Sequence, residues 1–230
     1  MTQNDSLEPR ASGGNGYTRT TQNRVPQGLR VRLPPRPPLS LLKRRKLAYL
    51  VGAALGDGNL SNPNGRAIRL RITCFAGYTK IAKEILDTIR FLFPKNAVSI
   101  VGRNPNCFDI SLYSNRLADW IPWQVNKGSK MAQHAHVPLW IMEDARLSQE
   151  CLRGLIQTDG CIYTDRGYLM INFVNNTEEL VEDAQDILID LGYHPTFSKV
   201  PNGRNPKYSV RIARSNEAKD LVQKLQLYKA

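Results

Sequence analysis

The sequence has no long apolar run and no paired-cysteine motif. No stretch approaches the ~18 residues that a membrane-spanning helix needs, and the polar, Pro-rich N-terminal segment has no apolar core typical of a signal peptide. The four cysteines show no Cys-x-x-Cys spacing, so we expect reduced thiols and no zinc site. The composition therefore predicts a soluble intracellular protein with no membrane partner, and it does not distinguish a cytoplasmic from an organellar location.

Acidic residues are scarce. The 230 residues contain 20 Asp and Glu against 32 Lys and Arg, which gives a net charge of +12. Residues 1–46 hold ten of these basic residues against only Asp5 and Glu8, so the N-terminal segment alone carries +8. Because such a basic arm on a moderately basic body favours a polyanion, the charge indicates nucleic acid as the partner.

Apolar residues make up 41% of the chain, enough for the core of one or two small domains. They are few in residues 1–39, which are rich in Gly, Pro, Ser, Thr, Asn and Arg and which we expect to form a disordered or extended basic arm. Ser40 is positioned to cap the helix that follows.

Two stretches of the remaining chain nearly repeat each other. Residues 50–58 (LVGAALGDG) and 152–160 (LRGLIQTDG) are helix-like, have Gly at the third place and end in Asp-Gly. Their acids, Asp57 and Asp159, are 102 residues apart. Further matches at an offset of 101 or 102 are Ser114 with Ser215, Asn115 with Asn216, and Lys127 with Lys229. The repeat indicates a duplicated unit with internal pseudo-two-fold symmetry.

Hydrophobic periodicity gives both units the same element order. Each reads helix, strand, strand, helix, strand, strand, helix, with Pro94 ending the second helix of the first unit, Ser148 predicted to cap the first helix of the second unit, and Gly192 ending its second helix. We therefore expect an α+β fold of two pseudo-symmetric αββαββα units. The expected boundaries are an arm at 1–39, units at 40–125 and 148–230, and a linker at 126–147.

The paired acids point to a metal ion. A carboxylate at the C-terminal end of a helix faces the negative end of the helix dipole, and a hard divalent cation reverses that penalty. Small residues, which allow two helix backbones to approach closely, line the first helix at Ala48, Gly52 and Gly56 and the second at Gly154 and Thr158. Two ordinary buried helices with turn aspartates are the alternative, but the repeat favours a shared Mg²⁺ site.

The two stretches resemble the signature helices of LAGLIDADG homing endonucleases in the single-chain, two-motif form, and the resemblance covers about residues 40–230. It implies that the two motif helices pack together and that the antiparallel sheets form a DNA-binding saddle. It further implies a monomeric, intron-encoded enzyme that cuts both strands of a long, specific DNA site. It also implies that Asp57 and Asp159 hold Mg²⁺, with Ca²⁺ or Mn²⁺ as substitutes, at the two scissile phosphates. The backbone carbonyls of Gly56 and Thr158 are further candidate metal ligands.

The family often places a Lys or Gln near each acid, and here that part of the match is incomplete. Cys74, Phe75, Asn172 and Asn175 stand on the strands where some relatives have Gln or Lys. The candidate catalytic lysines are Lys127 and Lys130, after the third helix, and Lys229, the repeat partner of Lys127. The alternative is that they are surface lysines close to phosphate.

The outward alternate residues of the strands, together with the hairpin tips, are basic and amide-rich, as expected of residues that pair with base edges and phosphates. The predicted DNA-binding set is Asn62, Asn64, Arg66, Arg69, Arg71, Arg103, Asn104, Asp109, Ser111, Tyr113, Arg166, Asn172, Lys199, Arg204, Asn205, Lys207, Ser209 and Arg211. A solvated sheet face is the alternative to DNA contact. An intron RNA maturase or a non-cleaving DNA-binding protein on the same scaffold is the alternative to a nuclease.

Overall fold

The computed structural model describes residues 39–201 and 206–229. The predicted N-terminal arm, except Leu39, therefore lies outside the described residues, as do the predicted DNA contacts Arg204 and Asn205. Within the described ranges no helix is long and apolar enough to cross a membrane.

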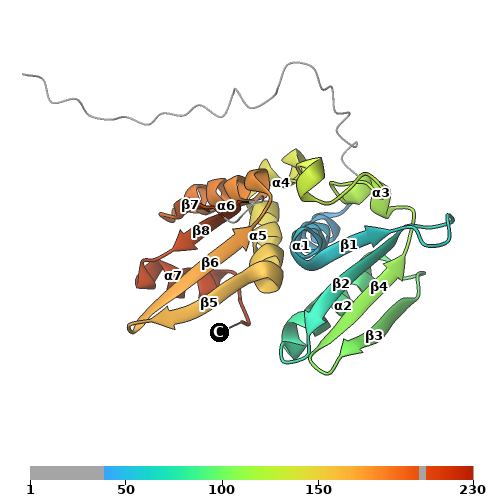
Figure 1. The fold of residues 1–230 in the computed structure, drawn as a ribbon, viewed down its shortest axis with the longest axis horizontal. Helices are drawn as coiled ribbons and strands as arrows, with labels where there is room; N and C mark the ends of the chain where they lie inside the picture. The colour runs from blue at the N-terminus through green and yellow to red at the C-terminus, as the bar shows by residue number, and fades with distance from the viewer. Residues whose placement is uncertain (1–38, 202–205, 230) are drawn as a thin grey trace, which may run out of the picture. The chain divides into compact units, whose positions relative to one another are not determined.

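The first half contains the predicted order of elements (Figure 1). They are α1 (Leu41–Asp57), β1 (Gly58–Ser61), β2 (Arg69–Phe75), α2 (Thr79–Leu92), β3 (Val98–Asn104), β4 (Cys107–Tyr113) and α3 (Leu117–Trp120). The strands form one antiparallel sheet in the order β1-β2-β4-β3. A short 3₁₀ helix (Met131–Gln133) and α4 (Leu139–Met142) follow before the second half begins.

The second half repeats this architecture. Its elements are α5 (Ala145–Asp159), β5 (Gly160–Asp165), β6 (Tyr168–Asn175), α6 (Glu178–Asp190), β7 (Thr196–Val200), β8 (Lys207–Ile212) and α7 (Ser215–Lys224). The second antiparallel sheet has the matching order β5-β6-β8-β7. The α+β fold with two repeated units, which the sequence predicts, is confirmed.

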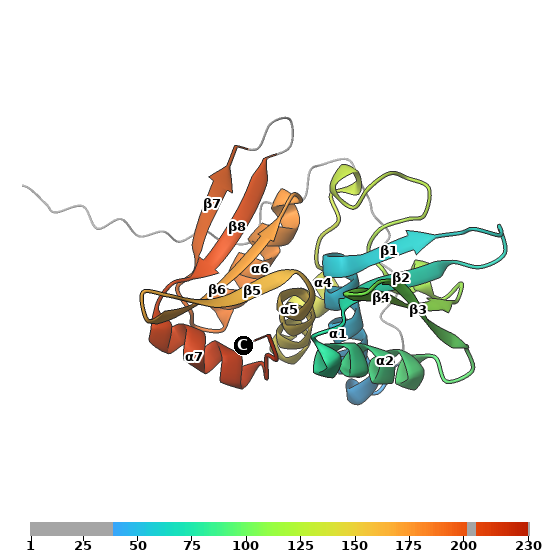
Figure 2. The same ribbon diagram turned by 60° about the horizontal axis from the view of Figure 1, so that its bottom comes forward.

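The two motif helices α1 and α5 pack directly against each other, and in both ribbon views they lie between the sheets (Figures 1 and 2). Gly52 faces the Cys151 carbonyl so closely that an added Cβ would overlap it. Gly154 faces the backbone of α1 in the same way, because a Cβ there would lie 2.6 Å from the Ala53 nitrogen. The close approach expected from the small residues is therefore present.

Hydrogen bonds and ion pairs between polar side chains also stabilise the pair of helices α1 and α5. The Tyr49 hydroxyl donates to Gln157 Oε1 at 2.8 Å inside the interface. Arg153 lies over the Tyr49 ring, 4.4 Å from its centroid, and forms ion pairs with Glu84 of α2 and Glu150 of α5. Since both carboxylates and the guanidinium are largely buried, each compensates the desolvation of the others.

Alternation along the strands separates a covered face from an open face. Leu70, Ile72 and Cys74 of β2 are buried beneath α1 and α2, whereas Arg69, Arg71 and Thr73, which point the other way, remain partly exposed. The second sheet buries Ile171, Phe173, Val210 and other apolar residues against α5, α6 and α7. Each sheet thus has one polar face that no helix covers, because successive strand residues point to opposite sides.

One predicted helix start is correct and one is wrong. Ser40 caps α1, and its hydroxyl accepts from the Lys43 amide. For α5 the cap is Asp144, whose carboxylate accepts from the Arg146 amide, so the helix begins one turn earlier than predicted. Ser148 lies buried inside that helix and donates to the Ala145 carbonyl. Ser148 fits the N-cap preference equally well in sequence, but only Asp144 precedes the first helical residue.

Replacing Gly154 by Ala tests the helix contact. An Ala inside a helix is normally favoured over Gly by about 1 kcal/mol. Here the added methyl group overlaps the backbone of α1, so we expect Gly154→Ala to lower the free energy of unfolding by about 1–3 kcal/mol in urea titrations. Gly102→Ala is the matched control, since no heavy atom lies within 4 Å of its added Cβ. Equal stability of the two variants would contradict the close packing.

Candidate functional site

The two Asp-Gly turns meet where α1 and α5 end. Asp57 and Asp159 are the last residues of their helices, and Gly58 and Gly160 start β1 and β5 immediately afterwards. Gly56 packs against Thr158 and Asp159, and a Cβ built on Gly56 would lie 3.3 Å from the Asp159 Cβ. The repeat thus places the two carboxylates on adjacent helix ends.

Asp57 lies in surroundings that disfavour its charged form. The pKa of Asp57 is raised to about 6, first because neighbouring atoms displace water from its carboxylate and second because Asp159 is close; Lys229 and Lys130 oppose the shift. As a whole residue Asp57 remains exposed, so a ligand can reach it from solvent. The site therefore gathers negative charge and leaves it accessible.

A lysine closes the C-terminal end of each motif helix. Lys130 Nζ donates to the carbonyl oxygens of Leu55 at 2.6 Å and of Ala54 and Gly56. Lys229 Nζ donates to the carbonyl oxygens of Thr158 at 2.6 Å and Gly160 at 2.7 Å. A cation at this end of a helix opposes the negative end of the dipole.

Both lysines are also held next to the acids. Burial lowers the pKa of each ammonium group, while Asp159 and Asp57 raise it. Lys127, by contrast, is an exposed residue of the linker. The repeat offset pairs Lys127 with Lys229, but in the structure Lys130 makes the matching contacts, because the intervening linker is not part of the repeated unit.

The two halves differ at the strand residue beside each acid. In the two sheets Gly58 pairs with Ile72 and Gly160 with Phe173, so the next inward positions, Cys74 and Asn175, are equivalent. Asn175 Nδ2 donates to Asp159 Oδ2 at 2.8 Å. Cys74 offers Asp57 only a thiol, whose pKa is raised to about 12 by burial and by Asp57 itself. An oriented amide therefore supports one acid and a neutral thiol stands beside the other.

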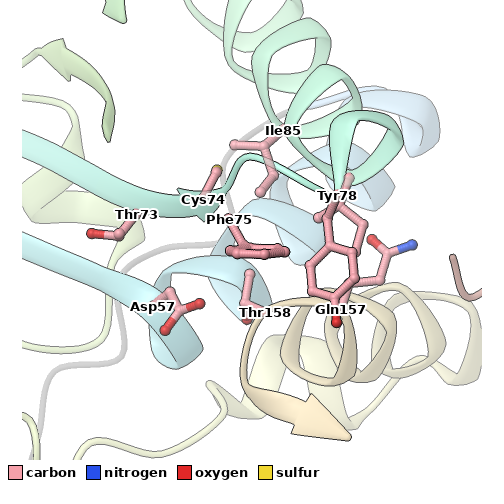
Figure 3. Close-up of a pocket in the computed structure, with 9 residues that line it drawn as sticks. Asp57, Thr73, Cys74, Phe75, Tyr78, Ile85, Gln157 and Thr158 are labelled. Atoms are coloured by element: carbon pink, nitrogen blue, oxygen red, sulfur yellow. The ribbon is translucent and has the colours of Figure 1, made fainter. Parts of the chain in front are cut away.

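A cavity of about 60 Å³ opens beside Asp57 (Figure 3). It lies among the ends of α1, β2 and α5 and the start of α2. Its lining residues are Asp57, Thr73, Cys74, Phe75, Tyr78, Ile81, Ile85, Gln157 and Thr158. A space of this size, with a carboxylate and hydroxyl groups in its wall, can hold ordered water.

The open face of the first sheet carries a connected polar network. Arg71 and Arg103 each approach Asp109 to 3.7 Å, and Thr73 donates to Asp109 at 2.8 Å. Arg69 donates to the Ser61 hydroxyl at 3.1 Å. Asp109, only 6% exposed, orients these arginines from within the sheet, and Ser111, 7% exposed, bonds Ser99. The predicted contacts Arg69, Arg71 and Arg103 are accessible, as is Tyr113.

On the second sheet one predicted residue lies on the wrong side. Asn172 pairs with Arg211, and Ser209 with Ser198, on the open face, which Lys207 shares. Lys199 pairs with Tyr208 on the opposite face, with its ammonium 5.0 Å from the Tyr208 ring centroid. The outward placement predicted for Lys199 is therefore wrong, because a shift of one residue along a strand reverses the face.

The hairpin tips project the remaining predicted residues. Asn62, Asn64 and Arg66 connect β1 to β2, and Asn104 ends β3. Arg166 lies in the turn between β5 and β6 and has a positive φ of 49°. Apart from the partly buried Asn62, these residues are exposed, as phosphate contacts require.

Tyr78 and Tyr228, which lie beside lysines in the structure, were not predicted as site residues from the sequence. Lys229 Nζ lies 5.6 Å from the Tyr78 ring centroid, and Lys80 Nζ lies 5.6 Å from that of Tyr228. For Tyr228, the sequence offers one indication, because the residue directly precedes the candidate catalytic Lys229. Tyr78 comes close only through folding, since its helix α2 begins beside the end of α5.

The donor set at the helix ends fits a hard divalent cation. No group of three or more His, Cys, Asp or Glu side chains that could hold a metal occurs in the described ranges. Mg²⁺ does not need one, since it is commonly bound through one or two carboxylates together with substrate phosphates and water. Asp57 and Asp159 supply two such carboxylates. The carbonyl oxygens of Gly56 and Thr158 accept hydrogen bonds from lysines, and each keeps a second lone pair.

Comparisons with known proteins match this geometry. Residues 147–226 match the model of the LAGLIDADG-like domain. A structure of mesophilic variants of the homing endonuclease I-DmoI has a TM-score of 0.58 at 19% identity and covers 80% of this chain and 90% of its own. A structure of I-DmoI with DNA and Mn has a TM-score of 0.56 at 19% identity, covering 82% and 98%. No curated protein sequence matches.

The same fold is found in full-length WhiA from Thermatoga maritima, with a TM-score of 0.56 at 15% identity; the match covers 86% of this chain and 60% of WhiA. At these identities the structural matches establish the fold. The second half of the chain matches the family by sequence as well, and the first half repeats its architecture with its own Asp-Gly helix. Residues 147–226 therefore match a LAGLIDADG-like domain, and the described chain has the fold of the homing endonuclease I-DmoI, with two Asp-Gly helices in one chain.

Proposed function

We propose that this protein is a monomeric, site-specific endonuclease that cuts both strands of double-stranded DNA with the help of a divalent cation. The observation that carries the proposal is the convergence of Asp57 and Asp159 at the ends of two glycine-packed helices, each end closed by a lysine. A protein that only bound DNA would gain nothing from placing two carboxylates together where a phosphate backbone must approach.

The open sheet faces supply the DNA contacts. Arginines of the first sheet and Lys207 and Arg211 of the second offer positive charge for phosphates, which provides affinity. Asn172 and Ser209, together with the arginines, offer the donors and acceptors that read base edges.

Asp57 and Asp159 would hold Mg²⁺, for which Ca²⁺ or Mn²⁺ can stand in. I-DmoI, with the same fold, has been crystallised with DNA and Ca and with DNA and Mn, and a variant of it with its target DNA in the presence of Mg. Such a cation activates water and stabilises charge on the leaving oxygen. Asn175 keeps the Asp159 carboxylate oriented through its 2.8 Å hydrogen bond.

Lys130 and Lys229 would stabilise the negative charge that grows on the scissile phosphates. Their ammonium groups are fixed by carbonyl oxygens of the motif helices and are close enough to both acids to interact with their charges. Fixed charges of this kind need no reorganisation when the reaction occurs.

The fold alone does not decide between cutting and binding, since a homing endonuclease and WhiA share it. A non-cleaving DNA-binding protein, or a protein that binds intron RNA, is the second candidate. Incubation with a randomised plasmid library and Mg²⁺, followed by mapping of the ends, separates the candidates. Reproducible ends at one long site support the nuclease, whereas binding without any cut supports the second candidate.

Asp57→Asn and Asp159→Asn should each abolish double-strand cleavage of the mapped site while leaving DNA affinity nearly unchanged, because each removes a metal ligand but none of the proposed DNA contacts of the open sheet faces. Plasmid linearisation and gel-shift titration measure the two properties. Asp119→Asn, at an exposed position of α3, is the control and should cut normally. Full linearisation by either site variant would overturn the metal role of that acid.

Lys130→Met should slow cleavage by roughly a hundredfold, because it removes a fixed cation from the acids. Lys127→Met, three residues away at an exposed position, should cut at the normal rate. Single-turnover kinetics on the mapped site measure the difference in cleavage rate. An unchanged melting temperature of Lys130→Met would show that the slower cleavage does not come from a destabilised helix end. Equal rates for the two variants would rule out a catalytic contribution of Lys130.

The raised pKa of Asp57 predicts that the free energy of unfolding of the metal-free protein depends on pH. Because the folded pKa, about 6, exceeds the ordinary value of 3.8, the folded protein binds a proton more tightly than the unfolded chain. The contribution of Asp57 to stability therefore falls as the pH rises from about 4 to about 6. In EDTA, Asp57→Asn should be more stable than the wild type at pH 7.5, and the gain should disappear near pH 4. Urea unfolding at both pH values measures this difference in the free energy of unfolding. A difference that does not change with pH would contradict the raised pKa of Asp57.

A further inference from the structure

We propose that Phe75 is a stacking wedge that packs against a nucleobase next to the cut in one half of the DNA site. The inference rests on the proposed function in taking DNA as the partner, but not on cleavage. It concerns a residue that carries neither charge nor metal-binding atoms.

Phe75 stands on the open face of the first sheet. Alternation along β2 puts it on the same side as Arg71 and Thr73, the residues of the polar network, and it pairs with Cys107 of β4. The residue as a whole is 47% exposed, although it follows the buried Cys74. It also lines the cavity that Asp57 borders (Figure 3). The ring therefore lies at the junction of the sheet face and the acids.

The ring is held in place but not covered. A Cβ added to Gly77 would lie 2.6 Å from Phe75 Cε1, so only glycine lets the chain pass this close to the ring. Tyr78 packs edge-on, with ring centroids 5.3 Å apart and planes at 67°, a favoured aromatic geometry. An apolar side chain that is held by neighbours yet about half exposed can stack on a flat partner at low cost, because little side-chain entropy remains to be lost.

The surroundings indicate which flat partner fits. Lys229 lies over Tyr78, and Arg71 and Arg103 flank Asp109 on the strand face, so the charges around the ring outside the acid pair are net positive. A polyanion that carries flat aromatic groups matches both features. Phenylalanine wedges between base steps are a known way to unstack and bend duplex DNA, and stacking of a base on an aromatic side chain strengthens binding substantially.

The wedge is present in one half. The position equivalent to Phe75 in the second sheet follows Asn175 and is the exposed, polar Asn176. Since one half offers a ring and the other an amide, the inference predicts distortion of the DNA on the Asp57 side and not on the Asp159 side. That difference would orient the protein on its site.

The test uses duplexes that carry the site recovered by cleavage mapping or by binding selection, with 2-aminopurine at each central position in turn. In Ca²⁺, the full-length wild type should raise 2-aminopurine fluorescence at one step, on the Asp57 side, since unstacking relieves quenching. Phe75→Ala should abolish that rise and weaken binding roughly tenfold. Phe91→Ala, which removes a ring 41% exposed on α2, is the control and should change neither.

Gly77→Ala keeps the ring but displaces it, and should reduce the fluorescence rise, while Gly102→Ala, with open space around its Cβ, should not. A rise that persists in Phe75→Ala, or no rise at any position with tight binding, would overturn the wedge. If the wild type gives the Phe75-dependent rise but never cuts in Mg²⁺, the nuclease proposal fails and the wedge stands. Failure to bind any duplex overturns both.

Discussion

The structure depends on the contact between α1 and α5. Gly52 and Gly154 bring the two backbones so close that a single methyl group would overlap the opposite helix. Everything else is arranged around this contact, because it fixes where both helices end. If the helices were farther apart, Asp57 and Asp159 would be two unrelated turn residues, and the two sheets would not be related by the same axis.

Bringing these ends together creates an electrostatic problem. Two helix C-termini and two carboxylates converge in one place, which raises the pKa of Asp57. Lys130 and Lys229 relieve part of the problem by donating to the terminal carbonyl oxygens. Their hydrogen bonds go to carbonyl oxygens and not to the carboxylates, so in the proposed function both acids remain available to a cation. The same lysines thus stabilise the helix ends and prepare the site.

Duplication has not kept the two halves identical. Asn175 orients Asp159, whereas Cys74 beside Asp57 cannot do so. On the open face, Phe75 stands where the second half has Asn176. A single chain can carry such differences because each half mutates independently, and an asymmetric protein can recognise an asymmetric DNA site.

The sequence by itself determined the duplicated α+β architecture and the pair of acids, because hydrophobic periodicity and the repeated Asp-Gly helices are local patterns that survive in a linear reading. Only the tertiary structure decided the details that depend on contacts between distant segments. Lys130, and not its neighbour Lys127, reaches the helix end because the linker folds back. Asp144 caps α5 in place of Ser148, and the register of β7 with β8 turns Lys199 away from the open face. These outcomes depend on the strand register, on the residue at which a helix starts and on the path of the linker. Residue type and spacing along the sequence do not determine these to a single residue.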